Sequence, residues 1–393
     1  MVGMFGAGAR LPPSDFLEDK VDTLGHVKLT RVQTNPVEPV FASLDDQAPL
    51  GDTADYLQVT GSVAGRVNIT AYDFWRRATG QAPGPAHLYY EMPVHADFKH
   101  AAKHLPEGVP TGKRGPLTAR LLFAPAGTWV RPFHYLANTF LTVLDGEVTV
   151  SLFAPNQTVN LYPYPRNHPN GRSTQVLHHE GLVSPWQVLD IATKFRNIPK
   201  AEGLKTTLSA GDTLYVPPFW YYQLHFLAPS VALKTFSSFY EGEVLDDLLR
   251  LDIPHIDHLD TEVAAVKRAI DLIAREALLQ DPSAFVRRLV ESRYTPLYQH
   301  LTLVTSTDFV PCQQGLDEQT EKHTQDFLLP YVAQVTNTLK ALDTFGFVKE
   351  LVTQEFVEHL VHKALGAEDA YNFYAHCFAT GVTNSRSTAQ DIE

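Results

Sequence analysis

The sequence has little of several features that mark whole classes of protein. It contains only two cysteines, Cys312 and Cys377, and their separation argues against a disulfide framework or a zinc ribbon. The net charge of −12 argues against nucleic acid as a partner, because phosphate binding needs clustered cations. No apolar run approaches the roughly 20 residues of a membrane span. We therefore expect an intracellular protein without a membrane span, cytoplasmic or nuclear by default, with a mitochondrial location left open.

Proline and aromatic residues are abundant instead. The 393 residues include 27 prolines and 11 % aromatics, and 44 % of the chain is hydrophobic. Proline lacks an N–H group and is excluded from helix interiors and central strands, so many turns and short strands are expected. The length allows two to three domains, or one large domain with extensions.

The middle of the chain has the texture of successive β-strands. β-branched and aromatic residues fill these runs, and Asp145-Gly146 supplies a hairpin turn between two of them. A Pro- and Asn-rich insertion from Tyr162 to about Gly203 interrupts the series. The pattern predicts a sandwich or barrel whose strands are Leu117–Ala124, Thr139–Leu144, Glu147–Phe153, Thr213–Val216, Trp220–Leu227 and Val231–Phe239.

After Gly242 the apolar residues recur with the 3.6-residue period of a helix. We expect a helix from Thr261 to Gln280 and a second one that begins at the Asp281-Pro282 pair. Further helices are predicted from Glu318 to about Thr344 and from Phe347 to Leu365, the last ended by Gly366.

The start of the chain shows no sustained periodicity. We expect an irregular N-terminal arm over 1–69, followed by a helix from Thr70 to Thr79. The predicted organisation is therefore an arm (1–69), a strand-rich core (70–242), a helical pair (243–295) and a helical C-terminal extension (296–393).

The strand-rich region contains a series of short motifs. They are Gly115–Leu122, Phe133–Tyr135, Leu152–Phe153, Leu161–Pro165 with His168–Pro169, Gly211–Pro217, and Phe219–Trp220 through Phe239–Gly242. Their order and spacing resemble those of the JmjC-domain, cupin-like family, and within it they are most similar to the asparaginyl hydroxylases that modify hypoxia-inducible factor. The resemblance implies a mainly β fold, a double-stranded β-helix or jelly roll, and an Fe(II)- and 2-oxoglutarate-dependent oxygenase as the family's activity.

The metal ligands that the resemblance implies are mostly absent. His134 occupies the first ligand position, but Leu136 stands where the family has a carboxylate, and Tyr222 stands at the distal histidine. A leucine offers no lone pair, and a neutral tyrosine is a poor ligand for Fe(II). His225 lies three residues beyond Tyr222, an odd offset that points it to the opposite face of a strand.

The residues at the positions implied for cosubstrate binding also differ from those of the family. Val148 replaces the family's lysine in the hairpin strand, and Ser237 replaces an asparagine near the end of the core. Lys234 lies at an odd offset from Ser237, so we expect it to point out of the barrel. Arg131 lies near the implied cosubstrate pocket, and with His134 and Tyr222 it forms a candidate residual pocket. The segment His178-His179-Glu180 is interpreted as a solvated loop.

We interpret the chain as a catalytically inactive JmjC-like protein without a cofactor, acting as a structural or interaction subunit. Two alternatives stay open. One is a cupin that binds a small carboxylate or other anion, and the other is a divergent oxygenase with a non-standard metal site, such as a ferric phenolate at Tyr222. The resemblance implies a homodimer or larger complex formed through the C-terminal helices, with interface candidates Val263, Val266, Ile270, Ile273, Phe285 and Leu289.

Overall fold

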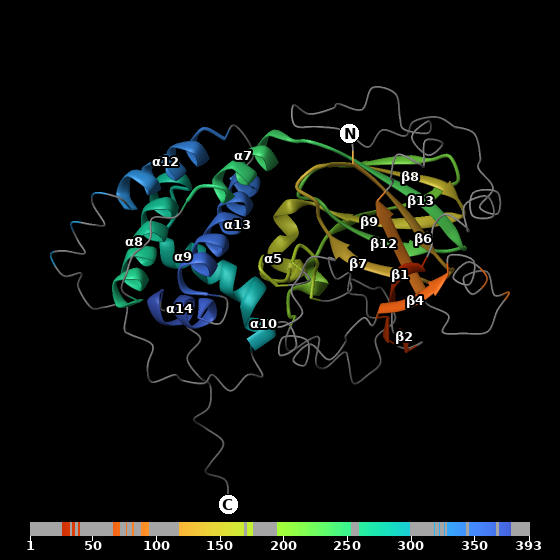
Figure 1. The fold of residues 1–393 in the computed structure, drawn as a ribbon, viewed down its shortest axis with the longest axis horizontal. Helices are drawn as coiled ribbons and strands as arrows, with labels where there is room; N and C mark the ends of the chain where they lie inside the picture. Colours follow the sequence, from red (N-terminus) through yellow and green to blue (C-terminus); the bar gives the residue numbers. More distant parts are fainter. Residues whose placement is uncertain are drawn as a thin grey trace, which may run out of the picture. The chain divides into compact units, whose positions relative to one another are not determined.

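The computed structural model divides the chain into two compact units, which are described separately. The barrel unit comprises Met1–Tyr164 and His168–Glu243, and the helical unit comprises Pro165–Asn167 and Val244–Glu393. Figure 1 shows strands in the first unit and helices in the second. The residues described are 26–31, 34–35, 38–39, 66–70, 76, 81, 88–93, 118–168, 171–175, 195–252, 259–298, 318, 322, 326, 328–342, 346–366 and 369–378.

Two antiparallel sheets build the barrel unit. The large sheet has the order β11-β8-β13-β6-β5-β1-β4, and the small sheet has the order β10-β9-β12-β7. The large sheet consists of β1 (His26–Arg31), β4 (Arg66–Thr70), β5 (Leu88–Pro93), β6 (Thr118–Ala124), β8 (Asn138–Asp145), β11 (Thr213–Val216) and β13 (Ser230–Ser237). The small sheet consists of β7 (Trp129–Phe133), β9 (Glu147–Phe153), β10 (Gly203–Ser209) and β12 (Tyr221–Phe226). A separate pair joins β2 (Thr34–Asn35) to β3 (Glu38–Pro39).

One apolar cluster fills the space between the two sheets. Leu141 and Ala232 of the large sheet and Val150 and Leu224 of the small sheet all belong to it. The sheets therefore face each other across a shared interior, and the predicted jelly-roll core is confirmed. Gly146 adopts φ +84° in the predicted hairpin turn, where a side chain would collide with Ser230 and with the Pro229 carbonyl, at the connection between β12 and β13.

The structure revises three predictions about the barrel unit. The predicted arm is not irregular throughout, because β1 and β4 pair with each other and β1 also pairs with β5. The strands β7 and β10 were not predicted, since neither has a clear alternation of its own. Thr70, where a helix was predicted to begin, is the last residue of β4. Of the rest of that predicted helix only Arg76 lies among the described residues, and it is helical.

The described residues of the insertion between β9 and β10 form three short helices. They are η2 (Pro155–Gln157), α5 (Thr158–Leu161) and η3 (Ile198–Lys200). Tyr162 follows α5 with φ 51°, and Tyr164 donates its backbone N–H to the carbonyl of Ser173 at 2.9 Å. The insertion is thus folded back on itself at its start.

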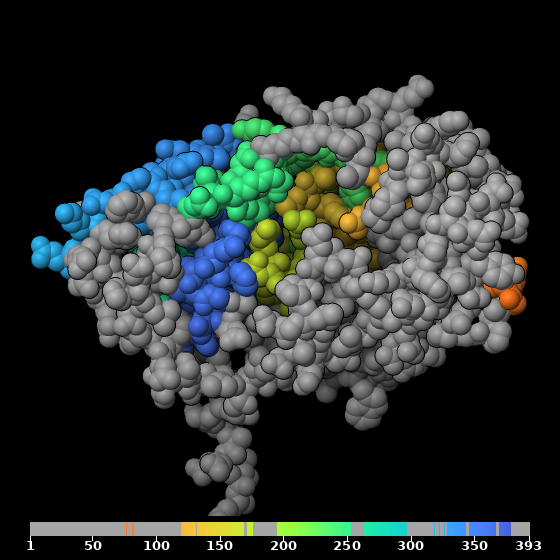
Figure 2. Space-filling model, in the orientation of Figure 1, coloured from red at the N-terminus to blue at the C-terminus, as the bar shows by residue number. Residues whose placement is uncertain are grey.

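The helical unit agrees with the predicted periodicity. Its helices are α7 (Tyr240–Leu249, which begins in the barrel unit), α8 (Leu259–Ala277), α9 (Pro282–Leu289), η4 (Val290–Tyr294), α10 (Thr295–Tyr298), α12 (Leu329–Lys340), α13 (Gly346–Leu365) and α14 (Ala370–Cys377). Asp281 caps α9 as predicted, accepting a hydrogen bond from the Ala284 N–H at 2.8 Å. The helix predicted over 318–344 contains α12, and the described residues Glu318 and Lys322 before it are helical as well. The helix α14 was not predicted. Figure 2 shows outer residues of this unit, in blue, on the face drawn.

The six interface candidates lie in the core of the helical unit. Val263, Val266, Ile270 and Ile273 of α8 are buried, as are Phe285 and Leu289 of α9. Helices α12 and α13 pack against α8 within the same chain. The apolar stripe is therefore covered by the C-terminal extension, whose packing the periodicity of α8 alone did not predict. The homodimer or larger complex stays a prediction.

The prediction that excluded a disulfide is wrong. Cys377 at the end of α14 is disulfide-bonded, and the chain has only one other cysteine, Cys312, which lies outside the described residues. Sequence separation does not limit such a bond, because the fold decides which distant residues meet. None of the described helices combines the length and apolar character of a membrane span.

Candidate metal and cosubstrate positions in the barrel

His134 and Tyr222 lie on opposite faces of the small sheet. The His134 ring is buried 4.6 Å from the ring of Tyr221, which packs with Phe153 outside the shared interior. Tyr222 belongs to the interior cluster, with its ring 4.3 Å from that of Phe133. Because successive strand residues point to opposite faces, the two candidate ligands do not converge. A ferric-phenolate centre that uses both is not supported by this geometry.

Leu136 and His225 supply no substitute ligand on the interior face. Leu136 lies half-buried between β7 and β8. His225 stacks on Trp129, with ring centroids 3.7 Å apart and planes 9° apart. The interior cluster contains the residues on either side of His225 in β12, so His225 faces away from Tyr222, as its odd offset predicts.

Val148 and Ser237, the residues at the two implied cosubstrate positions, contact other residues of the barrel unit. Val148 of β9 is fully buried in the interior cluster and carries no charge for a carboxylate to pair with. Ser237 accepts a hydrogen bond from the Asn138 side chain at 3.2 Å, and Asn138 in turn accepts one from the Tyr215 hydroxyl at 2.8 Å. These polar groups tie β8, β11 and β13 together.

Lys234 is the residue that the sequence interpretation misplaced. It was expected outside the barrel, but it is completely buried, and its Nζ lies 4.5 Å from the ring centre of Phe133. The rings of Tyr135 and Tyr222 each lie 5.7 Å from the same nitrogen. Lys234 shares the strand face of Ala232, which lies in the interior cluster. The prediction was wrong because it assumed that Ser237 points into the barrel and then placed Lys234, three residues earlier on β13, on the opposite face.

The rings around Lys234 explain how a cation is accommodated there. An ammonium over the face of an aromatic ring is stabilised by about 0.5–2 kcal/mol, more when desolvated. Three such rings come from β7, β12 and the turn after β7. Aromatic residues at alternate positions, Phe133 and Tyr135, were the sequence signal that could have indicated this arrangement.

Two predicted candidates lie outside what the structure describes. Arg131 belongs to β7, but its side chain is not described, and the segment His178-His179-Glu180 is not described at all. The candidate residual pocket of Arg131, His134 and Tyr222 is therefore not assembled by the described side chains, since His134 and Tyr222 face apart.

The donor set around Tyr222 differs from that of the oxygenases' iron site. Among the described residues, no three His, Cys, Asp or Glu side chains gather as a metal site would require. A second argument is electrostatic: at an effective dielectric constant of 20 and an assumed separation of about 6 Å, an ammonium and a divalent cation repel each other by roughly 5.5 kcal/mol. The residues around Tyr222 thus do not fit iron.

The comparisons with known proteins agree with the fold. The cupin-like domain family matches residues 40–241, about half of the chain. The chain belongs to this family. The matched region begins within the predicted arm, and the boundary at residue 70 stays a prediction.

A curated relative supports the JmjC relationship. Jumonji C domain-containing protein 5 of Drosophila melanogaster is 30 % identical over 121 residues, which are 30 % of this chain and 27 % of that protein. The chain thus matches about a quarter of the relative's length. Among solved structures, procruciferin, an 11S globulin of Brassica napus, has 14 % identity and a TM-score of 0.19 over 31 % of this chain and 21 % of its own, which is too slight a likeness to add to the argument. The JmjC resemblance is confirmed, and the narrower one to the asparaginyl hydroxylases stays a prediction.

Proposed function

We propose that this cupin-like protein does not carry out iron- and 2-oxoglutarate-dependent oxygenation and instead serves as a structural or interaction subunit. The observation that supports it is the lysine under three aromatic rings, inside the barrel and beside the distal ligand position. A built-in cation in this place opposes a second, divalent one. The loss of the carboxylate at Leu136 and the outward orientation of His134 act in the same direction.

The experiment measures metal and turnover on the full chain. The protein is incubated anaerobically with Fe(II), desalted and analysed by mass spectrometry for bound iron. It is then supplied with 2-oxoglutarate, ascorbate and air, and succinate is measured, with an active JmjC oxygenase assayed in parallel. We expect iron far below one equivalent and no succinate above the protein-free control. Stoichiometric iron together with succinate formation would overturn the proposal.

The interaction role needs its own measurement. Affinity isolation of the full chain at native expression, followed by identification of co-purifying chains, should recover a defined partner or a second copy. Recovery of the protein alone, as a monomer in solution, would contradict this part of the proposal.

A second candidate function is the binding of a small carboxylate inside the barrel. It is favoured by the register of Lys234 and Arg120 in neighbouring strands, which places a buried and an exposed cationic residue opposite each other on one sheet face. Thermal unfolding with dicarboxylates tests it, because a ligand at about 100 times its dissociation constant adds about 2.7 kcal/mol of stability. Lys205 is an exposed lysine of β10 and serves as the control. Stabilisation by a dicarboxylate that is lost in Lys234→Met but kept in Lys205→Met would favour this candidate.

A further inference from the structure

Three residues of the insertion belong to the helical unit although the chain on both sides belongs to the barrel unit. The chain leaves the barrel unit after Tyr164 and re-enters it at His168. We call Pro165–Asn167 the finger. The rings of Tyr164 and His168 stack at its base, with centroids 4.3 Å and planes 12° apart, and both residues are buried. The base is therefore a packed part of the barrel unit.

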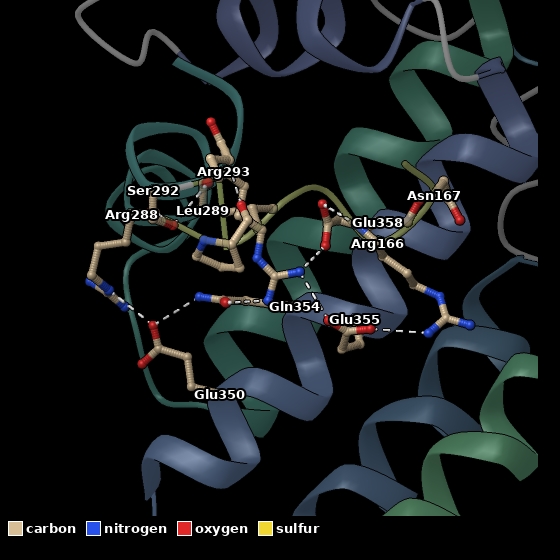
Figure 3. A network of polar contacts seen from close by, with 12 residues as sticks. Arg166, Asn167, Arg288, Leu289, Ser292, Arg293, Glu350, Gln354, Glu355 and Glu358 are labelled. Atoms are coloured by element: carbon tan, nitrogen blue, oxygen red, sulfur yellow. Dashed lines mark hydrogen bonds and ion pairs between the residues drawn. The ribbon is translucent and has the colours of Figure 1, made fainter. Parts of the chain in front are cut away.

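The tip of the finger makes polar contacts with α13. Arg166 Nη1 donates to Glu355 Oε2 at 3.0 Å, and the Arg166 backbone N–H donates to Glu358 Oε1 at 3.3 Å. The Asn167 side chain donates to the Glu358 carbonyl at 3.3 Å. Figure 3 shows Arg166 and Arg293 reaching Glu355 from two sides. The glutamate thus connects the finger to the interior of the helical unit.

The same two carboxylates also hold Arg293. This side chain, from η4, is almost fully buried and donates to Glu355 Oε1 at 3.0 Å, to Glu358, and to the Gln354 side-chain oxygen at 3.3 Å. When Glu358 is ionised, the two carboxylates and the one guanidinium leave one negative charge, and the Arg166 guanidinium beside Glu355 balances it. A buried charge without compensation is strongly destabilising.

The neighbouring histidine does not provide that positive charge. The pKa of His359 is lowered to about 4 by burial and then by the charges of Arg166 and Lys363, so the ring is neutral near pH 7. Within this cluster of described residues, the cation that completes the balance therefore comes from the finger.

We propose that the finger is a coupling element, through which the local stability of α13 depends on the packing of the barrel unit at Tyr164 and His168. The inference goes beyond the proposed function and does not depend on whether the barrel is catalytic. It predicts that a change at the base of the finger is transmitted to α13, and that the transmission needs the Arg166 guanidinium.

The experiment is hydrogen exchange on the full chain, followed by mass spectrometry. Arg166→Met should accelerate exchange in α13 and η4 at least about tenfold, a change of about 1.4 kcal/mol, while β8 and β9 keep their protection. Lys205→Met removes the same charge from an exposed strand and should leave α13 unchanged. Arg166→Lys should retain more protection in α13 than Arg166→Met, since lysine keeps the positive charge but lacks the planar set of donors of a guanidinium.

A double-mutant cycle tests transmission from the base. Tyr164→Leu should accelerate exchange in α13 when Arg166 is present and add nothing in the Arg166→Met background. Independent, additive effects of the two changes would overturn the proposal, as would an Arg166→Met protein whose α13 exchanges like that of the Lys205→Met control.

Discussion

The barrel unit and the helical unit each bury a cation, but they stabilise it by different means. Lys234 lies under aromatic rings, where the attraction comes from their quadrupoles. Arg293 lies among two carboxylates and a carboxamide, where it donates charge-assisted hydrogen bonds. The difference follows from side-chain chemistry: a guanidinium presents a planar fork of donors, whereas an ammonium is a compact charge. Removing Arg293 and removing Lys234 should therefore change the free energy of unfolding by different amounts.

The largest effect is expected at Arg293. Arg293→Met leaves two neighbouring buried carboxylates with one fewer cation, so we expect a loss of about 3 to 5 kcal/mol in the free energy of unfolding. Urea unfolding followed by helical circular dichroism measures it. The triple variant R293M/E355Q/E358Q, which removes the carboxylate charges too, should recover most of the loss. A loss below about 1 kcal/mol in the single variant would contradict this account of the cluster.

A smaller effect, in the opposite direction, is expected at Lys234. Lys234→Met keeps the chain length, removes a charge from an apolar interior and leaves the three rings packed on a thioether. We expect the free energy of unfolding to stay the same or rise by up to about 2 kcal/mol, by the reasoning that applies to buried ions replaced by apolar groups of similar volume. The same urea titration, followed by tyrosine fluorescence, checks it. A loss as large as that of Arg293→Met would show that the ammonium makes essential contacts in the barrel.

The smallest effect concerns pH. The pKa of Glu358 is raised to about 7, because burial disfavours the carboxylate more than Arg293 favours it. The folded state then holds the proton more tightly than the unfolded state, so the contribution of Glu358 to stability is largest below about pH 4.5 and declines as pH rises to 7. Glu358→Gln should flatten the fall in unfolding free energy between pH 5 and 7.5.

The neighbouring histidine provides an internal check on this profile. The lowered pKa of His359, about 4, makes stability fall as pH decreases from 6.5 toward 4, which is the opposite slope. That slope is present in both proteins and cancels in their difference. Parallel profiles for the wild type and Glu358→Gln would show that Glu358 does not titrate in this range.

Local sequence patterns predicted a large part of the fold. The alternation in Glu147–Phe153 and Thr213–Val216 placed β9 and β11 without error, and the stripe after Thr261 placed α8 to within a few residues. These elements carry their own period, so they can be read without knowing their neighbours. Strands β1, β7 and β10 carry no such period and depend on partner strands for their hydrogen bonds.

The candidate site was predicted only in part. The absence of a carboxylate at Leu136 and of a cation at Val148 is visible in the sequence, because it concerns residue identity at motif positions. The direction in which His134 and Lys234 point is a matter of strand register, and a shift of one residue exchanges the two faces. The inward lysine and the outward histidine were therefore decided by pairing across the sheets.

The sequence by itself determined the cupin-like barrel, the helical C-terminal region and the residue types at the ligand positions that the resemblance implies, since each follows from local pattern or residue identity. Only the tertiary structure decided which residues meet across long separations. It covered the apolar stripe of α8 with α12 and α13, joined Cys377 in a disulfide, and placed Arg166 on α13, nearly two hundred residues later in the chain. Contacts of this kind depend on the packing of whole elements, and no local period encodes them.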